Sequence, residues 1–454
     1  MRGGVEDGRL WWQRAVARGF DPAPAPDGPV ALVRDGRVLP DHDALTALPT
    51  GGLGVLLPTY VARCGLDEQR TALRHLLDAL AEVRASRPGL PLTLWLGMQY
   101  GPGELGEAVH RLRALTGTAA RAEGAGTTAA ADGAGPTASA GGAGAGASVD
   151  AVETGTSADG AGAGASEDAA GTVPAHAADT TGAGAAGAFP ADVVGFALPG
   201  PGKIRTVNAA LRLSRPLGHT GWLWTDDDVH LAPGCLARLV ARFQERGATG
   251  AVGAHLAALP RASAAARTMD RVSRVTTPPA PCPAAACMLV AAPVLAGGIP
   301  ARRLADDGHV LFELLDPAAP DPWHDLEVLP EARGSFYRVG RSHDTLRRLR
   351  RSLYSHVTCT ADYPWPVARL YLTGVLFHGL WPLAPWNGDG GWAWGAKRWT
   401  VKAVQAAWFC SVAAGLAARG LLGRPLRHVP WGDEGDFRSP AAEGRPTAVA
   451  AAQR

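Results

Sequence analysis

Apolar runs of strand length alternate with helical segments along most of this chain, and this alternation restricts the folds it can adopt. The apolar runs lie at 54–58, 90–97, 191–198, 221–225 and 250–256. The segments between them are predicted as helices, at 67–86, 104–115, 203–213 and 234–245. Buried strands joined by helices are typical of right-handed βαβ units. The sequence therefore predicts an α/β domain with a mostly parallel sheet flanked by helices.

One long segment interrupts this alternation. Residues 118–188 are nearly all Ala, Gly, Thr, Ser and Asp and contain no aromatic side chain. Such a segment cannot bury enough apolar area to offset a backbone ordering cost of about 1–2 kcal/mol per residue. We therefore expect a disordered insertion that divides the domain into 51–117 and 189–357. Residues 1–50 form an unassigned N-terminal extension, and 431–454 are predicted as a disordered tail.

Composition argues against several classes of protein. The formal net charge is +2, which gives no reason to expect a nucleic-acid partner. The six cysteines include no Cys-x-x-Cys pair, which argues against a zinc site and favours free thiols in a reducing compartment. The N-terminal residues are charged and have no apolar core of signal-peptide length. We expect the protein to lie in the cytoplasm or on the cytoplasmic side of the cell membrane.

Three consecutive carboxylates, Asp226, Asp227 and Asp228, directly follow the apolar run 221–225. In open α/β sheets, ligands bind beyond the carboxyl ends of the strands, and three adjacent acids at that place need a compensating cation. A hard divalent ion, Mn²⁺ or Mg²⁺, held by one or two carboxylates and by substrate phosphates, meets this requirement. The alternative is a solvated acidic turn that caps the next helix.

A glycine-rich stretch, 199–202, leads into a helix whose first turn holds Lys203 and Arg205. Helix N-termini and flexible glycine backbones favour phosphate, and a lysine adds a point charge. Asn208 and then the acidic strand end follow this segment in sequence. The order of these parts indicates a phosphate-binding site.

Two later segments also carry charge. Asp306 and Asp307 follow the apolar stretches 287–292 and 294–299, and by themselves they would cap a helix expected over 308–315. Further on, four arginines form two overlapping Arg-x-x-Arg pairs: Arg347 with Arg350, and Arg348 with Arg351. Guanidinium groups suit a diphosphate leaving group. A basic helix face that lies on anionic lipid is an alternative compatible with that role.

In this order, the motifs resemble those of the family 2 glycosyltransferases, and more narrowly the ceramide-glucosyltransferase-like branch, over roughly 54–357 without the insertion. The resemblance implies a GT-A-type, Rossmann-like domain that transfers a hexose from a nucleotide-diphosphate sugar to a hydroxyl acceptor, with inversion. The acceptor of such enzymes can be a lipid. The resemblance therefore adds a nucleotide-sugar donor, a lipid acceptor and a membrane surface to the expected partners.

The resemblance also implies roles for individual residues. Asp226 and Asp228 match the metal-binding Asp-x-Asp motif, with Asp227 beside them in the donor site. Asp307, next to Asp306, matches the base that takes the acceptor proton. The other residues placed in the donor site are Pro58, Tyr60, Gln99, Lys203, Asn208, Arg347, Arg348, Arg350 and Arg351.

The chain departs from the family pattern at two points. Its second strand ends in Leu-Gly-Met-Gln99-Tyr, where related enzymes have an Asp that reads uracil, and no Trp follows the arginine pairs. These departures keep open a degenerate, non-catalytic membrane-associated scaffold. A nucleotidyltransferase is the other alternative, but it would have its Gly-rich loop directly after the first strand, where this chain has Pro58–Arg63.

The C-terminal part, 358–430, is expected to be helical and to associate with a membrane. Two long apolar stretches, 367–386 and 403–422, are interrupted by charged residues or prolines. Seven tryptophans lie between Trp365 and Trp408, and tryptophan favours the membrane–water interface. An interfacial or re-entrant hairpin is the favoured interpretation, and spanning helices or a soluble helical cap are the alternatives.

Overall fold

The computed structural model describes residues 8–20, 31–41, 43–62, 64–128, 191–200, 202–259, 280–300, 305–336, 342–378, 380 and 391–425. The chain divides into two units, of which the second, Glu123–Ala188, is described only as far as Thr128. The architecture below belongs to the first unit, Met1–Ala122 with Phe189–Arg454. Most of the predicted insertion and all of the predicted tail lie outside the described residues.

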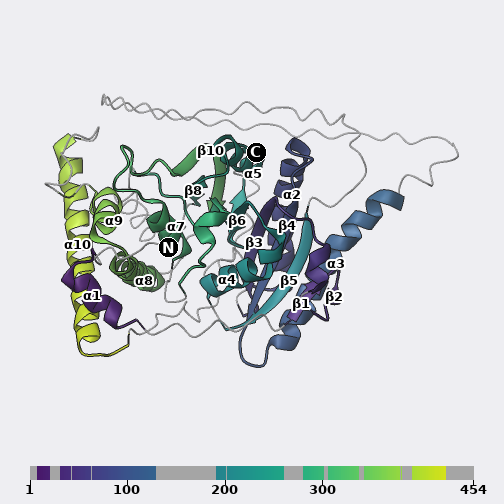
Figure 1. The fold of residues 1–454 in the computed structure, drawn as a ribbon, viewed down its shortest axis with the longest axis horizontal. Helices are drawn as coiled ribbons and strands as arrows, with labels where there is room; N and C mark the ends of the chain where they lie inside the picture. Colours follow the sequence, from purple (N-terminus) through teal and green to yellow (C-terminus); the bar gives the residue numbers. More distant parts are fainter. Residues whose placement is uncertain are drawn as a thin grey trace, which may run out of the picture. The chain divides into compact units, whose positions relative to one another are not determined.

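A single mixed sheet runs through the first unit (Figure 1). Across the sheet, the strands follow the order β2-β1-β5-β4-β3-β6-β9-β8-β10-β7. In chain order, the strands are β1 (Ala31–Arg34), β2 (Arg37–Val38), β3 (Leu53–Tyr60), β4 (Leu92–Tyr100), β5 (Asp192–Pro199), β6 (Gly221–Thr225), β7 (Val229–Leu231), β8 (Ala251–Ala258), β9 (Cys287–Ala291) and β10 (Leu326–Phe336). Strands β5, β4, β3 and β6 are parallel, as are β8 and β10. Strand β9 lies antiparallel between β6 and β8, so the parallel direction is kept across most of the sheet.

Helices cover both faces of this sheet. They are α1 (Trp11–Arg18), α2 (Leu66–Ser86), α3 (Leu105–Thr128), α4 (Lys203–Leu213), α5 (Cys235–Glu245), α7 (Asp306–Leu314), α8 (Ser342–Asp362), α9 (Trp365–Tyr371) and α10 (Gly391–Leu421), with a π-helix at Leu372–Leu376. Side chains alternate between the two faces: in β4, Leu94 and Leu96 pack with α2, α3 and α5, and Trp95 packs with α4 on the other face. The second face also carries α7 to α10, so it holds the larger core.

The predicted α/β fold is confirmed: a largely parallel sheet lies between helices, and an apolar helix follows toward the C-terminus. Several boundaries differ from the expectation. Helix α3 continues to Thr128, so the first residues of the predicted insertion are helical. Strand β1 pairs with β5, which makes part of the N-terminal extension a member of the sheet. Helix α8 runs through residue 357, where the sequence analysis had placed a domain boundary.

The N-terminal helix α1 packs against α8 and α10, far away in the sequence (Figure 1). Gln13 is fully buried, and its Nε2 donates to the carbonyls of Thr360, at 2.5 Å, and Tyr363, at 3.0 Å. Gly420 of α10 lies directly against α1, because a Cβ atom at this position would meet the Ala15 carbonyl oxygen at 1.7 Å. The two helices are thus in backbone contact at this point.

This contact predicts opposite effects for the same substitution at two glycines of α10. Gly420→Ala should lower the free energy of unfolding by about 1–3 kcal/mol, because the new methyl group overlaps the α1 backbone. Gly415→Ala should raise it by up to about 1 kcal/mol, because that position has open space and alanine favours the helix. Urea unfolding of both variants measures the difference. Equal effects would contradict the packing of α1 on α10.

Candidate active site

The candidate site lies where the strand order reverses. The chain passes from β3 through α2 to β4 on one side of β3, and β6 occupies the other side. Ligands of open α/β sheets bind at the carboxyl ends of the strands at such a switch point. Tyr60 ends β3 there, half-buried, and Asp226 follows β6. The carboxylates predicted from the sequence therefore occupy the expected edge of the sheet.

The three acids occupy a tight turn between β6 and β7. The Val229 N–H donates to the Asp226 carbonyl at 3.3 Å, and the Asp226 N–H donates to the Ala286 carbonyl at 3.1 Å. All three side chains are half-buried. Asp227 Oδ2 accepts a hydrogen bond from the Cys64 thiol at 3.4 Å. The turn is thus held by backbone contacts while its carboxylates remain partly accessible.

Lys203, the first residue of α4, joins this turn to a second acidic segment. Its Nζ lies 2.7 Å from Asp226 Oδ1, 3.1 Å from Asp306 Oδ2 and 2.9 Å from the Ala285 carbonyl oxygen. The Asp306 side chain is only 7% exposed and that of Lys203 only 14%. The site is therefore organised around one largely buried ammonium that lies between two carboxylates from distant motifs.

The charged groups of this cluster shift one another's pKa values. Burial by itself would lower the pKa of Lys203, but the carboxylates of Asp226 and Asp306 outweigh it and hold the pKa above its usual value. Burial raises the pKa of Asp306 to about 6, although Lys203 acts in the opposite direction. Among the described residues, Asp306 Oδ2 has no polar partner besides Lys203, so it depends on this ion pair for its charge compensation.

Asp306 and Asp307 open helix α7, which begins two residues earlier than the sequence predicted. Asp307 Oδ1 accepts the Gly308 N–H at 2.7 Å, but both acids lie inside the first turn of the helix, and the N-cap residue is Ala305. Unlike Asp306, Asp307 is only half-buried. Burial, with a contribution from Asp307, raises the pKa of the Cys282 thiol to about 12. A neutral thiol therefore lies near the more accessible of the two acids.

Two predicted donor-site residues have their side-chain amides bound within the protein. Gln99 Nε2 donates to Thr206 Oγ1 at 2.5 Å, and Gln99 Oε1 accepts the Gly202 N–H at 2.9 Å. Asn208 exchanges two hydrogen bonds with the backbone of Ile299, at 2.6 and 2.8 Å. These contacts fix the start of α4 against β4 and the middle of α4 against the segment that leads toward α7.

The other residues that the sequence predicted for the donor site are Pro58 and the four arginines. Pro58 is buried within β3. Arg350 is exposed on α8 and Arg351 is half-buried, whereas the side chains of Arg347 and Arg348 lie outside the described residues. The hydrogen bond of Cys64 to Asp227 and the electrostatic effect of Asp307 on Cys282 were not predicted from the sequence. Cys64 was identifiable in principle, because it follows β3 and so lies at the carboxyl edge of the sheet.

The donor chemistry of the site suits a hard divalent ion that is shared with a substrate. Asp226, Asp228 and the buried Asp306 Oδ2 are oxygen donors of the kind that Mn²⁺ and Mg²⁺ prefer. Within the described parts of the chain, no three His, Cys, Asp or Glu side chains form a group that could hold a metal. The carboxylates described here therefore supply at most part of the coordination of such an ion.

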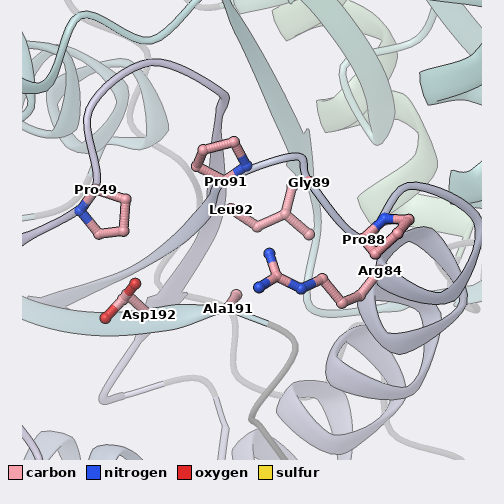
Figure 2. Close-up of a pocket in the computed structure, with 8 residues that line it drawn as sticks. All are labelled: Pro49, Arg84, Pro88, Gly89, Pro91, Leu92, Ala191 and Asp192. Carbon is pink, nitrogen blue, oxygen red and sulfur yellow. The ribbon is translucent and has the colours of Figure 1, made fainter.

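A separate cavity of about 240 Å³ lies at the opposite edge of the sheet (Figure 2). Leu92 and Asp192, which line it, are the first residues of β4 and β5. Proline, glycine and apolar side chains make up most of the rest of its lining, and Asp192 is paired with Arg34 at 3.0 Å. Ligands of open parallel sheets bind at the other ends of the strands, so this cavity is not part of the candidate site.

Comparisons with known proteins give distant structural likenesses. No family model matches the chain, and no curated protein matches its sequence. The mannosyltransferase PcManGT from Pyrobaculum calidifontis, in complex with GDP-Man and Mn²⁺, aligns over 92% of this chain and 87% of its own, with 14% identity and a TM-score of 0.37. Residues 1–349 of S. aureus TarS align over 83% of this chain and 93% of their own, with 10% identity and a TM-score of 0.33. TM-scores of this size do not establish a shared activity, so the function has to come from the residues of this chain.

The raised pKa of Asp306 predicts how stability depends on pH. The folded protein keeps this proton up to pH about 6, whereas an unfolded Asp loses it near pH 3.9, so the contribution of Asp306 to stability falls as pH rises between these values. From pH 4 to pH 7, the free energy of unfolding of the wild type should fall relative to Asp306→Asn by on the order of 2–3 kcal/mol. Urea unfolding at several pH values measures this. Asp67→Asn, at an exposed carboxylate, is the control, and parallel profiles for wild type and Asp306→Asn would contradict the assignment.

Proposed function

We propose that the protein is a glycosyltransferase that moves a sugar from a nucleotide-diphosphate donor to a hydroxyl acceptor. The observation that carries this proposal is the convergence of an acidic turn, a lysine at a helix N-terminus and a second acidic pair at the switch point of the sheet. A diphosphate leaving group needs positive charge, and a hydroxyl nucleophile needs a base. The two parts of the site supply these two requirements.

The donor diphosphate would bind at the acidic turn and the start of α4. Asp226 and Asp228 would hold Mn²⁺ or Mg²⁺, which supplies charge neutralisation of the leaving diphosphate when bound. The N-terminus of α4, with Lys203 and the backbone around Gly202, faces the same edge and favours phosphate. Gln99 and Asn208 support this arrangement indirectly, because their hydrogen bonds hold the start and the middle of α4.

The acceptor hydroxyl would lose its proton to Asp307. Of the two acids at the start of α7, Asp306 is buried in the ion pair with Lys203, whereas Asp307 is partly accessible. A base has to come within hydrogen-bond distance of the proton that it removes, which favours the accessible carboxylate. Direct proton removal from the acceptor by one base corresponds to a single displacement, with inversion at the sugar carbon.

Two substitutions at these acids should have different effects. Asp228→Asn should weaken Mn²⁺-dependent donor binding together with turnover, because it removes an anionic oxygen that the metal needs. Asp307→Asn should leave donor affinity intact and lower transfer by about 10²–10⁴-fold, because an amide cannot accept the proton. Calorimetry with nucleotide sugars and Mn²⁺ gives the affinities, and product formation gives the rates.

Other outcomes would identify the error. If both folded variants lose donor affinity equally, Asp307 belongs to the donor site and is not the base. If neither variant changes binding or transfer, the glycosyltransferase proposal fails. If the wild type binds donor without hydrolysing or transferring it in the presence of Mn²⁺, the chain is a non-catalytic scaffold, as the missing strand-end Asp would suggest.

We also propose that α1 and α10 bring the protein to the cytoplasmic face of a membrane, where a lipid could serve as acceptor. Helix α10 is long and apolar enough to cross a membrane over Gly395–Leu421, and 28% of its most apolar window is buried. The described residues expose eight large hydrophobic side chains, and six of these lie in or beside α1 and α10: Leu10, Trp11, Trp399, Val404, Leu421 and Leu422. Apolar side chains gathered on one helix pair favour a lipid interface.

Flotation with liposomes tests this second proposal. Val404→Glu combined with Leu421→Glu should shift the protein from the floating to the soluble fraction, because buried charge in the lipid interface is costly. The matched control combines Val38→Glu with Leu105→Glu, at exposed apolar positions elsewhere, and should float like the wild type. A soluble wild type, or equal flotation of both variants, would refute membrane binding through α10.

A further inference from the structure

The ammonium of Lys203 lies in a position that suits a small inorganic cation. It contacts Asp226 Oδ1 at 2.7 Å and Asp306 Oδ2 at 3.1 Å, so one positive charge bridges carboxylates from two separate motifs. Divalent ions contact carboxylate oxygens at about 2.0–2.6 Å, so a small approach of the two side chains would let a single ion take both oxygens. Lysine and a divalent ion are therefore alternative occupants of one position.

We propose that Lys203 is an internal counter-cation that competes with divalent metal for Asp226 and Asp306. The ammonium satisfies the two acids before any substrate arrives, and the free protein therefore holds divalent ions weakly at this position. This inference rests on the proposed metal-assisted reaction only for the choice of ion. It gives Lys203 a positioning role in addition to the direct contact with phosphate that its place at the start of α4 suggests.

The geometry of the ammonium supports this role. An ammonium group has three N–H donors, and three acceptors surround Nζ: Asp226, Asp306 and the Ala285 carbonyl at 2.9 Å. In this arrangement the Lys203 ammonium makes its contacts with acceptor atoms of the protein itself. A diphosphate that drew the ammonium toward itself would release carboxylate charge at the same moment, which couples donor binding to metal binding.

The coordination available from the protein supports it as well. In the described part of the chain, His, Cys, Asp and Glu side chains form no group of three that could enclose a metal. Asp306 Oδ2 is buried and has no hydrogen bond to replace the ion pair if the ammonium leaves. A cation is therefore required beside this oxygen in every state in which Asp306 is charged, and Lys203 provides it in the free protein.

Removal of the ammonium should strengthen metal binding by the free protein. Lys203→Met keeps the length of the side chain and removes its charge, so we expect the variant to bind Mn²⁺ about tenfold tighter than the wild type, or more. Titration of free Mn²⁺ by electron paramagnetic resonance, without any nucleotide sugar, measures both affinities. Lys397→Met, at an exposed lysine of α10, should bind like the wild type.

A second substitution tests which carboxylate the ion uses. In Lys203→Met combined with Asp306→Asn, one charge of each sign has been removed, so the gain in Mn²⁺ affinity should disappear. If the folded single variant binds Mn²⁺ no tighter than the wild type, the competition proposal is wrong. The same conclusion follows if the double variant keeps the whole gain, because Asp306 would then take no part.

Loss of folding in Lys203→Met would also be informative. Two buried carboxylates without a counter-charge destabilise a fold, and the proposal requires that Mn²⁺ can replace the ammonium. Thermal melts followed by circular dichroism should then show that Mn²⁺ raises the Tm of the variant more than that of the wild type. An unfolded variant that Mn²⁺ does not restore would overturn the proposal. Since no donor or acceptor is present, these outcomes are independent of whether the protein transfers sugars.

Discussion

One buried ammonium between two carboxylates connects the parts of this molecule that matter for function. Lys203 begins α4, Asp226 follows β6, and Asp306 begins α7, so a single ion-pair cluster joins a helix, a strand end and a second helix. Breaking such a cluster by removing one partner costs about 3–5 kcal/mol, because it leaves an uncompensated buried charge. The relative positions of the acidic turn and of Asp307 therefore depend on Lys203.

The sequence predicted the strands and helices that form the centre of the sheet, because their apolar runs are long and helices separate them. It missed β7, β9 and β10 for different reasons. Strand β9 lies within the apolar stretch 287–292, and no predicted helix separates this stretch from the next one, 294–299. Strand β10 contains Glu327, Pro330 and Glu331 and has an irregular register between Leu329 and Arg333, which hides its periodicity. The hairpin of β1 and β2 had a readable signal in Asp35-Gly36, both with positive φ, which is a turn pair typical of hairpins.

The candidate site was only partly accessible to sequence reasoning. The acidic strand end and Lys203 could be identified because general rules place phosphate and metal ligands at strand ends and helix starts. The ion pair between Lys203 and Asp306 could not be identified, because the two residues are far apart in the sequence and only the tertiary structure brings them together. Gln99 and Asn208 illustrate the same limit. Their amides suit a nucleotide, but in the structure they bind the first turn of α4 and the backbone of Ile299, and only tertiary packing decides between such partners.

The docking of α1 onto α8 and α10 also has a consequence for how the chain reaches its native state. The apolar side of α1, with Ala15 and Val16, has its partners near the other end of the polypeptide, so the contact is among the most non-local in the molecule. Non-local contacts form late, since a long loop must close before they contribute. During synthesis α1 leaves the ribosome long before α10 exists, and its apolar side chains stay exposed meanwhile. The apolar side of α1 therefore gains its native cover only after most of the chain has been made.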